Sequence, residues 1–77
     1  MTVVVRIERD SGGRLHGYVC ERRPDGLVIK GDDMLKRNVF RNVDFAVSEC
    51  DRQILELFKL IEPPTIRYVI DGEKAAT

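Results

Sequence analysis

The sequence predicts a two-layer α+β sandwich with the element order β-β-β-α-β. Three observations predict this class. Three β-branched stretches separated by glycine-containing turns occupy the first 30 residues. An apolar pattern with steps of three and four residues, which is the helical period, follows them. Pro63 and Pro64 then end this pattern, and one more β-branched stretch comes after them. We expect an antiparallel three-stranded meander plus one added strand, with a long helix on one face.

The first three strands are expected where β-branched residues alternate between two turns. The first strand covers residues 2–8, and a glycine-rich turn at 10–13 supplies the left-handed backbone positions that a hairpin needs. The second strand covers residues 14–21. Pro24-Asp25-Gly26 is a strong turn signal, and a short third strand at 27–30 follows it.

Alternation along each strand predicts which side chains share a face of the sheet. One face carries the more apolar set and is the expected inner face. This set comprises Val3, Val5, Ile7, Leu15, Gly17, Val19, Ile66, Tyr68 and Ile70. The opposite face carries His16, Tyr18 and Cys20 of the second strand. Because this outer face is half apolar, it offers a protein contact surface that includes Tyr18.

The helix is expected to run from about residue 33 to residue 61. Asp32 or Asp33 would cap its first turn, because a short acceptor side chain satisfies free N–H groups and its charge suits the helix dipole. A break near Ser48 to Asp51, with Asp51 capping a second short helix, is the alternative. The apolar stripe keeps its phase through this region, which favours one helix or a slight kink.

The last strand is expected over residues 65–71, after the proline pair turns the chain. A chain of 77 residues supports one domain, which we place at residues 1–72. Residues 73–77 are expected to form a frayed tail. The long connection through the helix lets the fourth strand join the sheet at an edge or between other strands, and the sequence does not distinguish these two positions.

Helix length predicts an interaction surface. A continuous helix over residues 33–61 would extend roughly 43 Å at 1.5 Å per residue. Four strands span only about 20 Å, so the second half of the helix would overhang the sheet. We therefore expect a self-association or partner surface centred on Leu57, Phe58 and Ile61. If the helix breaks near Ser48 and folds back, these residues belong to the core instead.

Charge and composition argue against several functional classes. The chain has 13 basic and 13 acidic residues, whereas a protein that binds duplex DNA normally shows a basic excess. No apolar stretch approaches the ~20 residues of a membrane-spanning helix, and no basic start of a signal peptide follows Met1. Cys20 and Cys50 lack the spacing of a metal or redox motif. We expect a cytoplasmic protein with no membrane association.

The sequence contains no catalytic, metal-ligating or cofactor motif. His16 is the single histidine. A catalytic histidine needs an orienting carboxylate and a nucleophile close by, and no spacing in the sequence indicates such partners. Aspartates in turns and caps are explained by local hydrogen bonding. We therefore interpret His16 as a residue of the sheet face and expect no catalytic residues, no metal and no cofactor.

Basic residues suggest an alternative partner. Single-stranded nucleic-acid sites combine basic grooves with stacking rings, and Tyr18 would supply such a ring. On an ordinary solvated surface, the positive charge of these basic residues is balanced by Asp32, Asp33 and Asp44. The net charge of zero for the whole chain favours that interpretation. The basic residues of this candidate patch are Arg22, Arg23, Lys30, Lys36, Arg37 and Arg41.

The layout resembles the N-terminal domain of HicB-like antitoxins over about residues 3–48. The matching features are a polar glycine turn (RDSGGR), a second turn (RRPDG), a short apolar strand that ends in glycine and acid (LVIKGDD), and an amphipathic helix. Pro24, Gly26, Gly31 and Asp32 fit the pattern of the family. The resemblance implies a partial ribonuclease H-like fold and a role in covering a toxin-like or other protein partner. The C-terminal DNA-binding domain that is common in this family is not expected here.

These observations predict a small non-enzymatic protein-interaction module. It would act as a HicB-antitoxin-like scaffold without a DNA-binding domain, covering a protein partner or forming a homodimer. The alternative is a nucleic-acid-binding accessory protein that uses the basic patch. A metal nuclease is a more distant third hypothesis, because a ribonuclease H-like fold does not by itself imply that activity.

Overall fold

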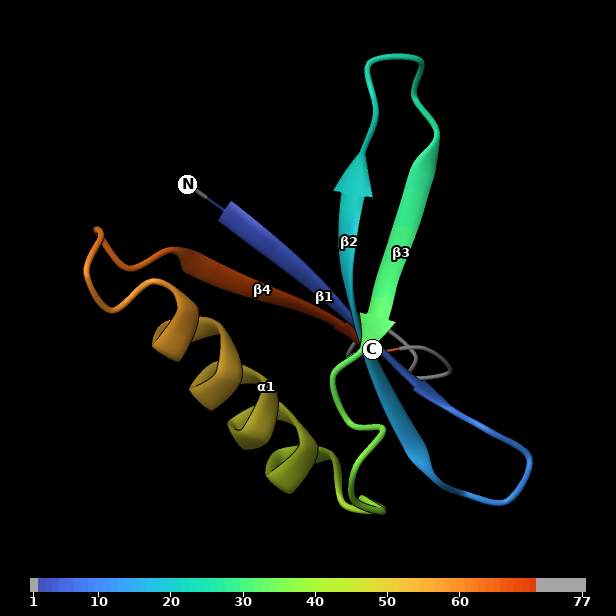
Figure 1. Cartoon of the computed structure of the whole chain (residues 1–77). Helices are drawn as coiled ribbons and strands as arrows, with labels where there is room; N and C mark the ends of the chain where they lie inside the picture. Colours follow the sequence, from blue (N-terminus) through green and yellow to red (C-terminus); the bar gives the residue numbers. More distant parts are fainter. Residues whose placement is uncertain (1, 71–77) are drawn as a thin grey trace, which may run out of the picture.

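The computed structural model describes residues 2–70 and shows a sheet layer with one helix packed on it (Figure 1). The strands are β1 (Thr2–Arg9), β2 (Leu15–Arg22), β3 (Val28–Asp33) and β4 (Thr65–Ile70), and the helix is α1 (Val43–Leu57). The predicted α+β class and element order are confirmed. The expectations for residues 71–77, namely the end of the last strand and the frayed tail, lie outside the described residues.

The strand order is β3-β2-β1-β4. β1 pairs with β2, and β2 pairs with β3, both antiparallel, which gives the predicted meander. β4 pairs with β1 in the parallel direction, because the crossover through α1 returns the chain to the end of the sheet where β1 started. The structure thus places β4 at an edge, a position that the sequence left open. β3 is the other edge strand.

Both predicted turns are present, and each contains a glycine with positive φ. In the first turn, Gly13 has φ 86° and its N–H donates to the carbonyl of Asp10 at 3.0 Å. The Asp10 Oδ1 atom also accepts from the N–H groups of Gly12 and Arg14, at 2.9 and 3.0 Å. In the second turn, Gly26 has φ 87°. These left-handed positions are the reason why the chain reverses within a few residues.

The core lies between α1 and the predicted inner face of the sheet. Side chains from β1, β2, the β3–α1 loop and α1 form it, and the helix contributes every fourth residue from Ala46 to Ile54. Residues of β4, including Tyr68, pack against this core. The fully buried apolar residues are Val5, Ile7, Leu15, Leu35, Ala46, Cys50 and Ile54.

The helix begins about ten residues later than predicted. Asn42 caps it, since its side chain accepts from the N–H of Phe45 at 3.1 Å. Asp32 and Asp33 are the last residues of β3, which continues beyond the predicted end at residue 30. The N–H of Met34 also donates to the carbonyl of Gly17 on β2, at 2.7 Å. Contacts with β2 therefore continue to residue 34, and the predicted cap at Asp32 or Asp33 is wrong.

The predicted overhang of the helix is also wrong. α1 has 15 residues, so it extends about 22 Å, close to the width of the four-stranded sheet. It runs without a break through Ser48 to Asp51, so the alternative of two helices is wrong as well. Phe58 ends it, and its N–H donates to the carbonyls of Ile54 and Leu55 at 3.2 Å.

Candidate functional site

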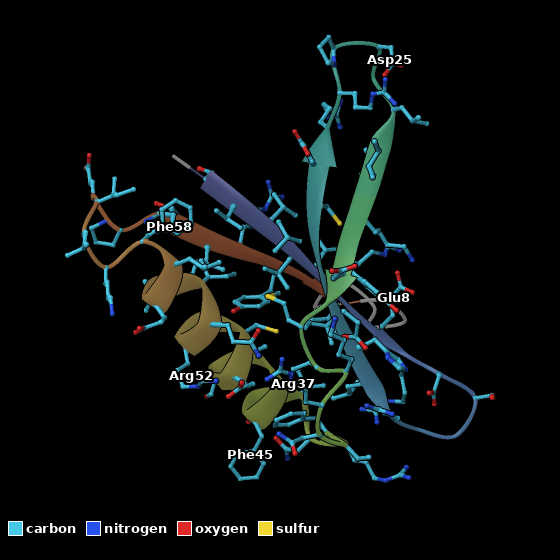
Figure 2. All side chains as sticks on the ribbon, in the orientation of Figure 1. Glu8, Asp25, Arg37, Phe45, Arg52 and Phe58 are labelled. Atoms are coloured by element: carbon cyan, nitrogen blue, oxygen red, sulfur yellow. The ribbon has the colours of Figure 1, made fainter. Side chains whose placement is uncertain are left out.

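The residues predicted as an interaction surface lie at the end of α1 and in the connection to β4. Phe58 turns towards the sheet and packs against the core, as Figure 2 shows. Leu57 and Ile61 point to solvent, with 78 % and 65 % of their surface exposed. Leu60, which is not among the predicted contact residues, is 91 % exposed. We refer to Leu57, Leu60 and Ile61 as the end patch.

Tyr18, the fourth predicted contact residue, lies on the outer face of the sheet. Its ring stacks beside that of His16, with centroids 6.4 Å apart and an angle of 18° between the planes. The ammonium group of Lys30 lies 4.7 Å from the centre of the Tyr18 ring. Lys30 also donates to Glu8 Oε2 at 2.8 Å. The ring of Tyr18 is therefore partly covered by its own neighbours.

The six predicted basic residues do not form one patch. Arg22 and Arg23 lie where β2 leads into the turn at the tip of the β2–β3 hairpin, which projects away from the helix (Figure 1). Lys36, Arg37 and Arg41 lie in the loop between β3 and α1, at the other end of the molecule, and not on helical turns as predicted. Lys30 is paired with Glu8 between these two groups.

The β3–α1 loop, residues 34–42, is fixed to the sheet by arginine side chains. Arg14 Nη2 donates to three carbonyl groups of the loop backbone, and Arg9 Nη1 donates to the carbonyl of Arg41 at 3.1 Å. The carbonyls that accept from Arg14 belong to Leu35, Lys36 and Asn38, at 3.2, 2.8 and 3.4 Å. The N–H of Leu15 donates to the carbonyl of Phe40 at 2.7 Å. The loop backbone is thus held against the sheet by hydrogen bonds.

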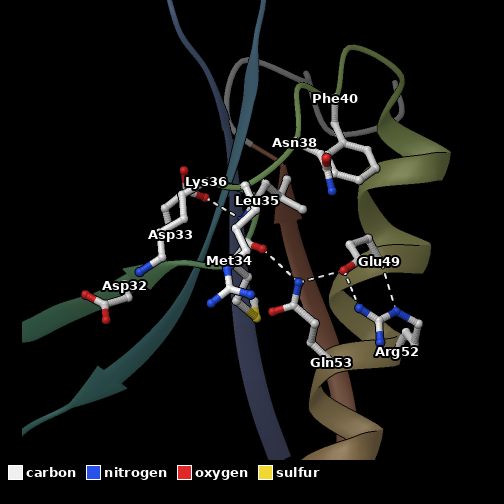
Figure 3. Close-up of a pocket in the computed structure, with 11 residues that line it drawn as sticks. Asp32, Asp33, Met34, Leu35, Lys36, Asn38, Phe40, Glu49, Arg52 and Gln53 are labelled. Atoms are coloured by element: carbon white, nitrogen blue, oxygen red, sulfur yellow. Dashed lines mark hydrogen bonds and ion pairs between the residues drawn. The ribbon is translucent and has the colours of Figure 1, made fainter.

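The same loop is also fixed to α1 (Figure 3). Gln53 Nε2 donates to the carbonyl of Met34 at 2.8 Å and to Glu49 Oε2 at 2.7 Å. Arg52 donates to both carboxylate oxygens of Glu49, at 3.0 and 2.6 Å. These hydrogen bonds, the one from Arg52 first, lower the pKa of Glu49 to about 2. Glu49 therefore carries its charge throughout the ordinary pH range and orients both neighbours.

Two adjoining hollows lie along this loop and α1, with volumes of about 570 and 630 Å³. They share Phe40, Glu49 and Arg52 as lining residues, so we treat them as one loop–helix groove. Lys36 and Arg37 line the first hollow, which is the one in Figure 3. The second hollow is the more apolar, and its lining includes Val39 and Phe45.

His16 has partners that the sequence did not indicate. Its Nδ1 atom lies 2.7 Å from Asp33 Oδ2, and its Nε2 atom lies 2.8 Å from Asp10 Oδ2. The doubly protonated imidazolium satisfies both carboxylates, since it carries an N–H on each nitrogen. The hydrogen bonds to Asp10 and then to Asp33 raise the pKa of His16. The interpretation of His16 as a residue of the sheet face is therefore incomplete.

The charge of His16 acts on both aspartates. Its hydrogen bond lowers the pKa of Asp10. Burial raises the pKa of Asp33, but the bonds that Asp33 accepts from His16, Gly17 and Leu35 lower it below the ordinary value overall. Asp10 is in the first turn of the same hairpin, so hairpin geometry could have indicated that contact. Asp33 is brought in by the pairing of β3 with β2, for which the local sequence carries no signal.

Comparisons with known proteins give no relative for this chain: no family model, no curated protein and no solved structure matches it. Within residues 2–70, no group of three or more His, Cys, Asp or Glu side chains is placed to hold a metal ion. In the same part of the chain, no helix has the length and apolar character needed to cross a membrane.

Proposed function

We propose that this chain is a small, non-enzymatic protein-interaction module that self-associates through the end patch. The observation that carries this proposal is the exposure of three neighbouring branched apolar side chains, Leu57, Leu60 and Ile61. A contiguous exposed apolar patch usually marks a contact with another protein. Burial of such side chains in a dimer stabilises it by about 25 cal/mol for each Å² of apolar surface removed from water.

The balance between core and surface supports the same function. Among the described residues, seven apolar side chains are buried, whereas ten large apolar side chains are exposed. A domain of this size buries a smaller fraction of its surface than a larger one, and association with a second copy is a common way to compensate. We therefore propose a second copy of the chain as the partner, which gives a homodimer, and treat an unrelated protein as the alternative partner.

We further propose that the scaffold is of the HicB-antitoxin type. The β-β-β-α-β order, the antiparallel meander and the crossover through α1 to a strand beside β1 support this proposal. Cys20 and Cys50 are free thiols, and burial raises the pKa of Cys50 to about 12, which makes it unreactive. Free thiols are typical of a reducing compartment, so we place the module in the cytoplasm.

The nucleic-acid alternative has less support. A site for single-stranded nucleic acid needs cations that follow the backbone beside exposed rings. The basic residues of the predicted patch lie in separate parts of the fold, and Lys30 is neutralised by Glu8. The ring of Tyr18 is covered on one side by the same lysine.

Solution mass by light scattering tests the proposal. We expect the wild type to show twice the monomer mass of 8.8 kDa, and Leu60→Asp to be a folded monomer at the same concentration. Leu60 is suitable because its exposure makes unfolding by this change unexpected, whereas Phe58 packs against the core. Leu27→Asp is the matched control, an equal change at an exposed residue of the hairpin tip, and should leave the dimer intact.

Two results would overturn the proposal. The first is a monomeric wild type with the same mass as Leu60→Asp. The second is a dimer that survives Leu60→Asp but dissociates with Leu27→Asp, which would move the contact to the β2–β3 hairpin and its edge strand. Circular dichroism of each variant establishes that the fold is retained.

A further inference from the structure

We propose that the loop–helix groove binds a short acidic and apolar peptide segment of a partner protein. This surface is separate from the end patch and extends the function beyond self-association. The groove runs along the β3–α1 loop and along α1 as far as Gln53, whereas the end patch comprises the last residue of the helix and two residues of the connection after it. One copy can therefore use both surfaces at the same time.

The apolar part of the groove fits an apolar side chain of a ligand. Phe45 lies on the solvent side of α1 and is 70 % exposed, and Val39 in the loop is 60 % exposed. Figure 2 shows Phe45 projecting away from the ribbon at the first turn of the helix. Both residues line the second hollow together with Phe40, which also packs against the core. A side chain seated among these three would remove apolar surface from water on all of them.

The charged part of the groove favours an anionic ligand. Lys36 and Arg37 line the first hollow, and neither forms an ion pair with another described residue. Arg41 lines the second hollow and donates only to a neutral acceptor, the carbonyl of Gly12, at 2.6 Å. These three cations keep their charge available for carboxylates of a ligand.

The acidic residues of the groove do not cancel this charge. Glu49 is satisfied by Arg52 and Gln53. Asp33 is satisfied by the imidazolium of His16. Asp32 is the lining carboxylate that has no ion pair among the described residues, so three available cations face one available anion. The combination of an apolar hollow with a cationic rim matches a peptide in which acidic residues flank apolar ones.

Hydrogen bonds to the rest of the fold also fix the loop wall of the groove. One wall is α1, and the other is a loop whose backbone carbonyls are bonded to Arg14, Arg9 and Gln53. A ligand therefore does not have to order this loop, which removes part of the usual entropic cost of binding. These hydrogen bonds to its backbone distinguish the loop from an ordinary solvated loop.

Fluorescence anisotropy with a labelled synthetic peptide tests the proposal. The probe is acetyl-Glu-Glu-Leu-Phe-Glu-Glu-amide, with two comparison peptides that carry Lys in place of Glu, or Ser-Ser in place of Leu-Phe. We expect saturable binding of the probe alone. The double variant Lys36→Glu with Arg37→Glu, and separately Phe45→Asp, should each weaken binding at least tenfold. The matched control, Arg22→Glu with Arg23→Glu at the hairpin tip, should leave the affinity unchanged.

Other outcomes overturn the proposal. Failure of the acidic peptide to saturate overturns it, and so does equal weakening by the hairpin control. Binding of an oligothymidine strand at lower concentration than the peptide, abolished by the same variants, would make the groove a nucleic-acid site instead. The monomeric variant Leu60→Asp should bind the peptide as well as the wild type does. That measurement separates this proposal from the self-association described above, because either can fail without the other.

Discussion

His16 joins three segments of the chain through its two ring nitrogens. It belongs to β2, Asp10 belongs to the turn that precedes β2, and Asp33 is the last residue of β3. When the imidazolium loses a proton, one carboxylate loses its hydrogen-bond donor, since a neutral ring has a single N–H. The charge state of His16 thus decides whether Asp10 and Asp33 can both accept a hydrogen bond from it.

The pH dependence of stability follows from the direction of this shift. The pKa of His16 is higher in the folded state than its ordinary value of 6.5. A group whose folded pKa is raised stabilises the fold fully below its unfolded pKa, and this contribution is lost as pH rises through the folded pKa. We expect the free energy of unfolding in urea to be lower at about pH 8.5 than at about pH 6.

His16→Gln is the control for this measurement, because glutamine does not titrate. The variant should show a flat profile across the same interval. A wild-type profile as flat as that of the variant would contradict the bonded geometry of His16. Asp10 and Asp33 have lowered pKa values, so their contributions are present above about pH 4 and lost only in acid.

At the scale of elements, the β3–α1 loop shows where local sequence is insufficient. Leu35 and Val39 continue the apolar period of the helix, yet Leu35 is buried in a loop and Val39 is exposed. The period could not show that Arg14 would bond the loop carbonyls, since that residue lies more than 20 positions away. Asn42 and Asp33 are both good capping residues by type, and only the tertiary contacts decide between them.

Asn42→Ala tests the observed start of the helix. The change removes the acceptor of the Phe45 N–H, and loss of an N-cap costs about 0.5–2 kcal/mol. We expect a lower free energy of unfolding in urea by about 1 kcal/mol. Asn38→Ala is the matched control, because only the backbone carbonyl of Asn38 is used in the fold. Equal losses in the two variants would mean that Asn42 does not cap α1.

The end patch and the groove also differ in how far the sequence predicted them. The sequence predicts exposure of Leu57 and Ile61 because it predicts an overhanging helix. The helix does not overhang, and α1 ends at Leu57. Both residues are nevertheless exposed to solvent. The groove was not predicted, because it depends on the loop conformation. Lys36, Arg37 and Arg41 are predicted from the sequence as part of a basic patch, but only the fold places Arg41 in the same hollow as Phe45.

At the scale of the whole molecule, α1 makes a hydrogen bond with β4 and a close approach to β2 beside the shared core. The hydroxyl of Tyr68 on β4 donates to Asp51 Oδ1 on α1 at 2.5 Å, and burial followed by this bond raises the pKa of Tyr68. On β2, Gly17 lies opposite Cys50, and a Cβ atom at this position would lie 2.8 Å from the Cys50 Sγ atom. The absence of a side chain at Gly17 is what allows the two layers to approach.

Gly17→Ala should therefore destabilise the protein. Overpacking of a close contact typically costs about 1–3 kcal/mol, and we expect a loss in this range from urea denaturation. The penalty should shrink in a Cys50→Ala background, because the colliding sulfur is gone. Gly12→Ala, where an added Cβ meets only an ordinary contact at 3.4 Å, should change stability by less than about 0.5 kcal/mol. A neutral Gly17→Ala would show that the layers are farther apart.

Fold class and the inner face of the sheet could be predicted because they depend on local period and turn chemistry. Val5, Ile7 and Leu15 alternate as a strand requires, and all are buried. The position of β4 could not be predicted, since pairing of Ile66 with Val3 joins residues at opposite ends of the chain.

That long-range pairing has a consequence for synthesis of the protein. β1 and β2 can pair as soon as both have left the ribosome, whereas β4 is made after the whole of α1. At roughly 5–20 residues per second, the open side of β1 waits about 3–12 s for its partner strand. During this interval β1 presents unpaired backbone N–H and C=O groups along one edge. A chaperone that binds this edge would therefore be displaced when β4 docks against β1.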